Sequence, residues 1–233
     1  MSKQKRCNNC SSRKGANVYK FANLRLFRCK TCDLVYSLEP AAYFTDPDRD
    51  SISYRPGRDL SHALSYCKGP DLRILQLDCG EGLWLSAFAG VQTHTIETCG
   101  TESRDDRATL AISRGHEIWR QSPDDLDLPR ESFDFVFAIH ILEQSLDPGD
   151  LADRVYDSLK PAGIFLIRAL DGDRCSLDRL PLPVNYLFSR ESLEYLALKI
   201  GFEPVETGRK TILPRSGEDA GAVLDVLLHR PDR

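Results

Sequence analysis

The stretch from residue 72 to residue 85 constrains the fold of this chain more than any other segment. It begins with a short apolar run of strand length over residues 72–77. Gly80 and Gly82 then remove two Cβ atoms where the backbone must turn sharply, and an apolar helix follows up to Gly90. This order places backbone N–H groups and a helix N-terminus at the carboxyl end of a parallel strand. In an open α/β sheet, nucleotides and related ligands bind there.

The glycine spacing excludes two common phosphate-binding motifs. A P-loop needs Gly-Lys-Ser/Thr after its first glycine, and no lysine follows Gly80. A dinucleotide fingerprint needs G-x-G-x-x-G, but Leu85 occupies the third glycine position. The stretch resembles motif I of class I S-adenosylmethionine (SAM)-dependent methyltransferases, with Gln76 in place of the acidic residue and Asp78 in place of the first glycine. The resemblance implies SAM contacts from Asp78, Cys79, Gly80 and Gly82.

Two residues of this turn leave alternatives open. Cys79 either lines the ligand site or packs as a small buried hydrophobic residue. Asp78 either faces the sulfonium or the methionine ammonium group of SAM, or it intrudes on the cofactor with its Cβ and carboxylate.

Two later segments resemble the same family. Gly100-Thr101-Glu102 would end the second strand, where the Glu102 carboxylate can accept hydrogen bonds from the ribose hydroxyls of the cofactor. Residues 132–143 resemble the family's S-F-D, hydrophobic run and H-x-L-E-H segment, with Gln144 in place of the closing histidine. The apolar run predicts a buried parallel strand that brings His140 to the ligand crevice, and the resemblance implies that His140 also contacts the cofactor there. His140 would then position substrate or act as a base, or it is a structural histidine that hydrogen-bonds a loop.

The resemblance assigns the adenine ring to the loop after the third strand, with contacts from Ser122 and Pro123. Ser122 stands where the family usually has aspartate, so this contact would be neutral. Asp124 and Asp125 follow closely; they either substitute for that aspartate or are solvated loop carboxylates.

Residues 171–187 are predicted to form a long loop over the carboxyl edge of the sheet, where substrate is selected. Arginines that could bind an anionic substrate there are Arg168, Arg174 and Arg179. The connector contains Tyr54, Arg55 and Arg58. The resemblance implies that an aromatic and a basic residue from this region cover the SAM site; alternatively, these three are solvated linker residues.

The remaining apolar segments follow the order of elements in this family. Further strands are predicted over residues 95–101, 116–121, 163–167, 202–206 and 222–228, and helices are predicted to begin at Ser103, Asp147 and Ser189. Pro204 favours an edge position for its strand. The resemblance implies an α/β, Rossmann-like fold with a seven-stranded, mostly parallel sheet and an antiparallel C-terminal hairpin.

Four cysteines near the N-terminus have the spacing of a metal site. Cys7-x-x-Cys10 and Cys29-x-x-Cys32 are separated by 18 residues, in the range for a four-cysteine zinc site. Four thiolates fill the tetrahedral shell of Zn²⁺, so the metal would be structural. We predict a small zinc ribbon over residues 1–45, a connector with a short helix over residues 46–70, and a methyltransferase-like domain over residues 71–233.

The charge is unevenly distributed along the chain. Residues 1–45 hold nine Lys/Arg against two Asp/Glu, a net charge of +7, whereas the remainder holds 22 against 33, a net charge of −11. A basic ribbon can contact nucleic acid or another anionic partner. Alternatively, its lysines and arginines offset the negative charge of metal-bound thiolates.

Hydrophobic patterning argues against membrane insertion and secretion. No apolar run is long enough to span a bilayer, and the first residues lack the apolar region of a secretory signal. We therefore expect a cytoplasmic protein with reduced thiols.

The resemblance implies a SAM-dependent methyltransferase that acts on an unidentified small-molecule, glycan or macromolecular acceptor and releases S-adenosylhomocysteine (SAH). The alternative is a catalytically degenerate protein of the same fold that binds nucleic acid or protein through its basic ribbon.

Overall fold

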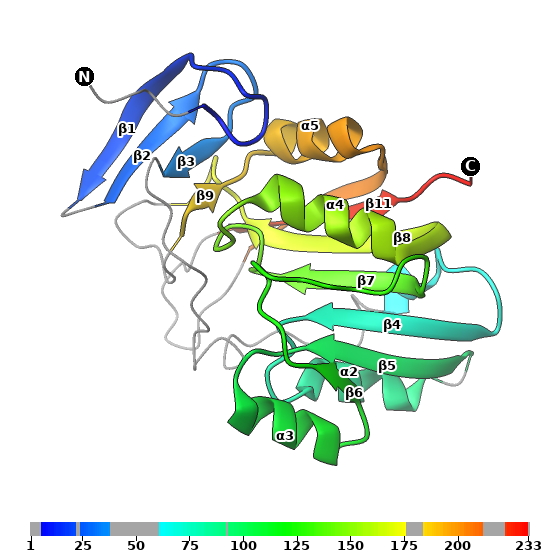
Figure 1. The fold of residues 1–233 in the computed structure, drawn as a ribbon. Helices are drawn as coiled ribbons and strands as arrows, with labels where there is room; N and C mark the ends of the chain where they lie inside the picture. The colour runs from blue at the N-terminus through cyan, green and yellow to red at the C-terminus, as the bar shows by residue number, and fades with distance from the viewer. Residues whose placement is uncertain are drawn as a thin grey trace.

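The computed structural model describes residues 6–21, 24–37, 61–91, 93–175, 184–211 and 222–232. In this part of the chain seven strands form the larger sheet, in the order β10-β11-β8-β7-β4-β5-β6 (Figure 1). These strands are β4 (Asp71–Leu77), β5 (Thr95–Thr101), β6 (Glu117–Trp119), β7 (Phe133–Ile139), β8 (Leu159–Leu170), β10 (Glu203–Thr211) and β11 (Ala222–His229). Neighbours from β6 to β8 pair in parallel, whereas β11 pairs antiparallel with both β8 and β10. The predicted α/β fold with an antiparallel C-terminal hairpin is confirmed.

β4 lies at the centre of the five parallel strands, between β5 and β7. Gln76 is paired with Gly100 of β5, and Leu77 is paired with Ala138 of β7. The three strands therefore end at the same edge of the sheet. The chain leaves β4 to build β5 on one side and later β7 on the other, so this edge is the switch point where open α/β sheets bind ligands.

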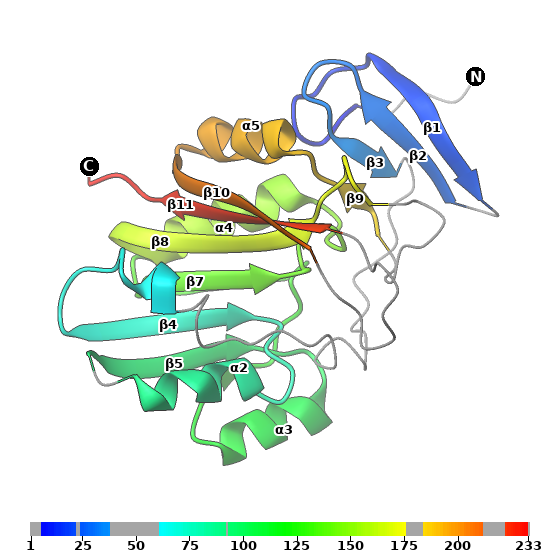
Figure 2. The ribbon, with the colours of Figure 1, turned by 180° about the vertical axis from the view of Figure 1, so that it is seen from behind.

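Helices cover both faces of the sheet (Figures 1 and 2). They are α2 (Leu83–Ser86), the 3-10 helix η2 (Ala87–Gly90), α3 (Asp105–Ser113), α4 (Pro148–Ser158) and α5 (Arg190–Ile200). α4 and α5 share one buried apolar cluster with the sheet, and α2, η2 and a helical turn over residues 61–64 share the other. In the second cluster Phe88 contacts the rings of Phe135 and Phe137, with centroids 6.4 and 5.9 Å apart.

The helix starts are partly as predicted. Asp147 and Ser189 cap α4 and α5 with their side chains. Ser103 does not cap α3, because the N-cap residue is Arg104 and its N–H donates to the carboxylate of Glu102. The helix after the glycine turn is also shorter than predicted: α2 has four residues and continues only as the 3-10 helix η2.

A second, four-stranded sheet joins the N-terminal ribbon to the body. Its order is β1-β2-β3-β9, formed by β1 (Gly15–Phe21), β2 (Leu24–Cys29), β3 (Val35–Ser37) and β9 (Tyr186–Leu187). β9 belongs to the segment predicted as a substrate loop, yet it pairs antiparallel with β3. The ribbon therefore lies against the body beside α5 (Figures 1 and 2).

The ribbon also shares its buried core with the body. Cys7, Cys29 and Tyr36 belong to the same apolar cluster as Tyr186 and Phe188. A module this small cannot bury enough apolar surface by itself, so the body supplies the core that the ribbon lacks. The boundaries at residues 45 and 70 stay predictions, and residues 38–60 lie outside the described part of the chain.

None of the helices in the described residues is long and apolar enough to cross a membrane.

Arg168, one of the arginines that could bind an anionic substrate, lies inside the sheet in an ion pair. Its side chain is 1% exposed and pairs with Asp225, which lies directly opposite on β11. Both Nε and Nη2 of Arg168 donate to the carboxylate, and the Nη2–Oδ2 distance is 2.6 Å. Arg174 is exposed, whereas Arg179 lies outside the described residues.

Replacing Asp225 by alanine is expected to destabilise the protein by about 3–5 kcal/mol, because a buried guanidinium loses its counter-charge. The control is Asp157→Ala, which breaks an exposed pair with Arg130 and is expected to cost less than about 1 kcal/mol. Urea denaturation measures both changes, and equal effects of the two variants would contradict the assignment.

Candidate functional site

The turn after β4 has a left-handed backbone conformation, which glycine adopts most easily, at three alternate positions. Asp78, Gly80 and Gly82 have φ angles of 47°, 59° and 76°. Asp78 thus keeps the backbone path of the glycine it replaces in the motif, and aspartate is among the residues that tolerate this left-handed conformation. The turn is anchored to the end of β5: the N–H groups of Asp78 and Cys79 donate to the hydroxyl and carbonyl oxygens of Thr101, at 3.0 and 2.8 Å.

The side chain of Cys79 packs between the turn and β5. Cys79 is 1% exposed and lies in the apolar cluster on the α2 face. A Cβ on Gly100 would lie 2.6 Å from the Cys79 Sγ and 3.0 Å from Ile118. Gly100 is therefore needed to let the turn close onto β5.

The His116 ring packs against the turn at Gly82, a role that the sequence did not indicate. A Cβ on Gly82 would lie 2.6 Å from the His116 ring. The ring is fixed at both nitrogens, by the hydroxyls of Ser86 at 3.0 Å and Thr98 at 2.8 Å. Burial lowers the pKa of His116, so the ring favours its neutral form.

Glu102 follows β5 as predicted and lies beside the turn. Its side chain is fully buried, and one carboxylate oxygen accepts from the N–H of Arg104 at 2.7 Å. The pKa of Arg104 is raised, mainly by its hydrogen bond to Asp106 and to a smaller extent by the charges of Glu102 and Asp78. Glu102 and Asp78 directly follow β5 and β4, which are neighbours in the sheet.

The loop after β6 is held by its own side chains. The backbone folds over Ser122, whose hydroxyl and carbonyl oxygens accept from the N–H groups of Asp124 and Asp125. Pro123 is buried. Asp124 accepts from the N–H of Leu146 at 2.7 Å, so it ties this loop to the segment after β7.

His140 directly follows β7 and lies in a buried hydrogen-bond network. It has a left-handed backbone, with φ 56°, and its side chain is 1% exposed. Its Nδ1 donates to the carboxylate of Glu143 at 2.7 Å, because a carboxylate only accepts. The same Glu143 oxygen accepts from the N–H of Leu170 at 3.1 Å, and the Gln144 amide donates to the carbonyl of His140 at 2.8 Å. The network fixes the ring tautomer and leaves Nε2 as the acceptor nitrogen.

The residues at this edge fit a polar ligand. Among the described residues, the buried side-chain oxygens Gln76 Oε1, Glu143 Oε2 and Gln144 Oε1 have no hydrogen-bond partner. Buried polar atoms are normally paired, so such atoms near the ends of β4 and β7 indicate a place for a ligand that can donate hydrogen bonds. Of the other residues proposed for this site, Tyr54, Arg55 and Arg58 lie outside the described part of the chain.

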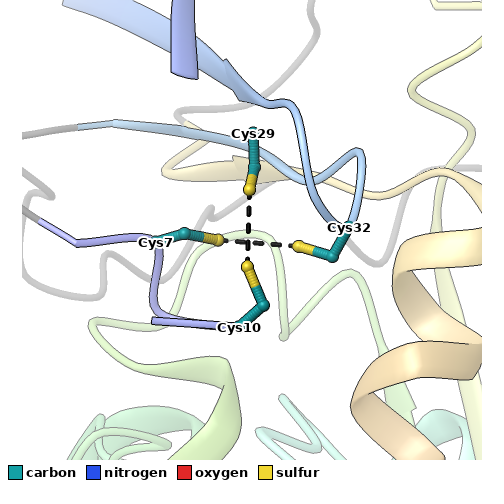
Figure 3. Close-up of side chains that lie close together, drawn as sticks. All are labelled: Cys7, Cys10, Cys29 and Cys32. Carbon is teal, nitrogen blue, oxygen red and sulfur yellow. Dashed lines mark hydrogen bonds between the residues drawn. The ribbon is translucent and has the colours of Figure 1, made fainter. Parts of the chain in front are cut away.

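The four cysteines of the ribbon converge on one point (Figure 3). The Sγ atoms of Cys7 and Cys32 are 3.6 Å apart, and those of Cys10 and Cys29 are 3.4 Å apart. Four sulfurs at about 2.3 Å from one tetrahedral ion would be about 3.8 Å apart, so the cluster has nearly the size of a metal shell. The hydrogen bond between the two thiols lowers the pKa of Cys7 to about 5 and raises the pKa of Cys32, as expected when two sulfurs this close share a proton.

The two knuckles have the same backbone form. Ser11 and Asp33, each directly after a second cysteine, have φ angles of 58° and 62°. In both knuckles this residue's N–H donates to the carbonyl of the first cysteine. The repeated turn orients each cysteine pair toward the common centre.

Comparisons with known proteins agree with this geometry. A family described as a methyltransferase domain matches residues 48–207, more than half of the chain. A curated "Ubiquinone biosynthesis O-methyltransferase" from Bradyrhizobium is 29% identical over 103 residues, which are 43% of this chain and 40% of that protein. The chain spans less than half the length of such curated relatives.

Solved structures establish the fold. A SAM-dependent methyltransferase structure from Methanosarcina mazei aligns with 73% of this chain and 97% of its own, at 16% identity and a TM-score of 0.60. The [4+2]-cyclase SpnF aligns with 83% of this chain and 88% of its own, at 16% identity and a TM-score of 0.62. Since one of the two is described as a cyclase, the fold alone does not define the reaction.

Replacing Gly100 by alanine is expected to destabilise the protein by about 1–3 kcal/mol, because the new methyl group overlaps Cys79. The double variant Cys79→Ala/Gly100→Ala should regain most of this loss. Gly208→Ala is the control, since nothing lies within 4 Å of a Cβ there. Thermal unfolding measures the series, and a Gly100→Ala variant as stable as Gly208→Ala would refute the contact.

Proposed function

The chain belongs to the SAM-dependent methyltransferase family, and from this premise we propose that it transfers a methyl group to a hydroxyl acceptor at the shared edge of β4, β5 and β7. One observation carries the proposal: the strand register brings the glycine-type turn, Glu102 and His140 to one edge. The name of the curated relatives, an O-methyltransferase, supports an oxygen acceptor.

We propose that the turn at Asp78, Cys79, Gly80 and Gly82 holds the methionine part of SAM through its backbone. Glu102 would accept hydrogen bonds from the ribose, and the Ser122–Pro123 loop would contact the adenine. SAM supplies an electrophilic methyl group when it is bound. The part of these residues is to orient the cofactor and to exclude water, which favours a near-attack arrangement with the acceptor.

His140 is proposed as the general base. Because Glu143 holds the Nδ1 proton, Nε2 can accept the proton of an acceptor hydroxyl. The carboxylate of Glu143 would also stabilise the imidazolium that results. A positioned base of this kind contributes roughly 10²–10⁴-fold to a rate.

For the ribbon we propose a structural Zn²⁺ held by Cys7, Cys10, Cys29 and Cys32. A closed shell of four thiolates leaves no open position for substrate. The metal would stabilise the ribbon, and no step of methyl transfer would involve it.

Isothermal titration calorimetry with SAH tests the cofactor site. The wild-type chain is expected to bind SAH, and Glu102→Gln is expected to weaken binding by about 10–100-fold, as the loss of charge-assisted hydrogen bonds would. Glu97→Gln is the matched control, since Glu97 is an exposed carboxylate at the other end of β5.

Absence of heat at millimolar SAM and SAH would overturn the enzyme assignment. Salt-dependent binding of RNA by the same sample would then favour the alternative function, a binding module that uses the basic ribbon of residues 1–45.

Metal analysis of the purified chain is expected to find one zinc per chain. The variant Cys7→Ser/Cys29→Ser should lose the zinc and unfold at a lower temperature, because metal binding contributes to the folding of such modules. Cys175→Ser, outside the cluster, should keep the full zinc content. A zinc-free wild-type protein of unchanged stability would refute the metal site.

A further inference from the structure

We propose that Asn185 is a positioning residue that couples the four-cysteine ribbon to the His140 turn, defined here as residues 140–146. The ribbon would then keep His140 in place for methyl transfer as well as being stabilised by the body. This inference rests on the proposed role of His140.

Asn185 joins the two parts through four hydrogen bonds. On the ribbon side, its carbonyl oxygen accepts from the N–H of Ser37 at 2.7 Å. On the side of the His140 turn, its N–H donates to the carbonyl of Glu143 at 2.7 Å. Its amide group donates to the carbonyls of Gln144 at 2.8 Å and Ser145 at 3.2 Å. The residue is 7% exposed, so water does not compete strongly for these bonds.

Tyr186 extends the same connection. It lies opposite Tyr36 in the β3–β9 pair, and its side chain is fully buried in the cluster that contains the cysteines. Its N–H donates to the carbonyl of Glu143 at 3.0 Å, and its hydroxyl donates to the carbonyl of Leu146 at 2.7 Å. Four successive carbonyls of the His140 turn, from residue 143 to residue 146, are thus held by two residues of the ribbon sheet's edge.

A short path of hydrogen bonds links Asn185 to the second cysteine knuckle through β3. β2 ends at Cys29, whose N–H donates to the carbonyl of Leu34 directly before β3. β3 in turn pairs with β9 and ends at Ser37. A change in the second cysteine knuckle therefore displaces β3, and with β3 the partner of Asn185.

The His140 turn needs such support because its backbone is strained. His140 has a left-handed φ of 56°, which is costly for a residue other than glycine. Its ring is held by Glu143, and the backbone carbonyl of Glu143 is the group that Asn185 and Tyr186 both bind. Loss of the Asn185 side-chain amide would release the carbonyls of Gln144 and Ser145, loosen the turn and weaken the hold of Glu143 on the ring at Nδ1.

Histidine-selective NMR of the zinc-loaded, full-length protein tests this coupling. The chain has five histidines, and the spectrum of His140→Gln assigns the His140 signals. In wild type the Nδ1 proton of His140 should be protected from exchange with water. In Asn185→Ala and Asn185→Asp its exchange should become at least about tenfold faster, as expected for the loss of one or two hydrogen bonds.

Asn9→Ala is the matched control. Its amide also joins the ribbon to the body, by donating to the carbonyl of Ser192 at 2.8 Å, and it is buried, but it does not contact the His140 turn. We expect Asn9→Ala to leave the exchange at His140 unchanged. Equal acceleration in the Asn9 and Asn185 variants would overturn the proposal, because general loosening of the ribbon would then explain both.

Removal of zinc from the wild-type protein by a thiol reagent and chelator gives a second measurement that needs no substitution. The exchange at His140 is expected to accelerate as in Asn185→Ala, whereas the signals of His62, whose ring contacts Glu206 and Tyr66, should not move. An unchanged His140 signal would refute the coupling. SAH calorimetry on the same samples separates this failure from failure of the proposed function, since the NMR signals require no cofactor.

Discussion

The register of β4 between β5 and β7 is the constraint on which the rest of the structure depends. It sets the ends of three parallel strands side by side, and each end carries one part of the candidate site. The turn then closes onto β5 only because Gly100 leaves room for Cys79 and Gly82 leaves room for His116. A one-residue slip of β4 would exchange its buried faces and separate the turn from Glu102. The site is thus a consequence of sheet packing.

Much of the fold and of the candidate site could be predicted from sequence, because the motifs that indicate them are local. The glycine turn, the cysteine knuckles and the caps at Asp147 and Ser189 each depend on residues within a few positions of one another. Three features could not be predicted: β9, the role of His116 and the Arg168–Asp225 pair. β9 has two residues, too few to show a period. The other two depend on contacts that exist only once strands distant in sequence have paired.

The pairing of β3 with β9 changes the interpretation of the ribbon. From sequence it is a basic appendage, and its charge favours an anionic partner. In the structure its sheet is completed by the body, and its cysteines lie in the core of the body. Across the contact, the Asn9 side-chain amide donates to the carbonyl of Ser192, and the backbone carbonyl of Asn9 accepts from Lys199. Part of its positive charge is also offset within the ribbon, where Arg28 pairs with Asp33 at 2.9 Å. These contacts favour a ribbon that acts on its own domain.

Two departures from the family motif, Asp78 and Gln144, preserve the backbone conformation of the site. Asp78 adopts the φ of the glycine it replaces, so the path of the turn is kept. Gln144 replaces a histidine, yet its side-chain amide donates to the carbonyl of His140, while its backbone carbonyl accepts from the Asn185 side chain. The second histidine of the family pattern is therefore replaced by a residue that fixes the backbone of the first. In the proposed mechanism, a single base held by Glu143 needs no histidine partner, because the carboxylate sets the tautomer and supplies the counter-charge. Gln144 lacks the imidazole of the family's second histidine, but its hydrogen bond to the His140 carbonyl fixes the backbone that carries His140.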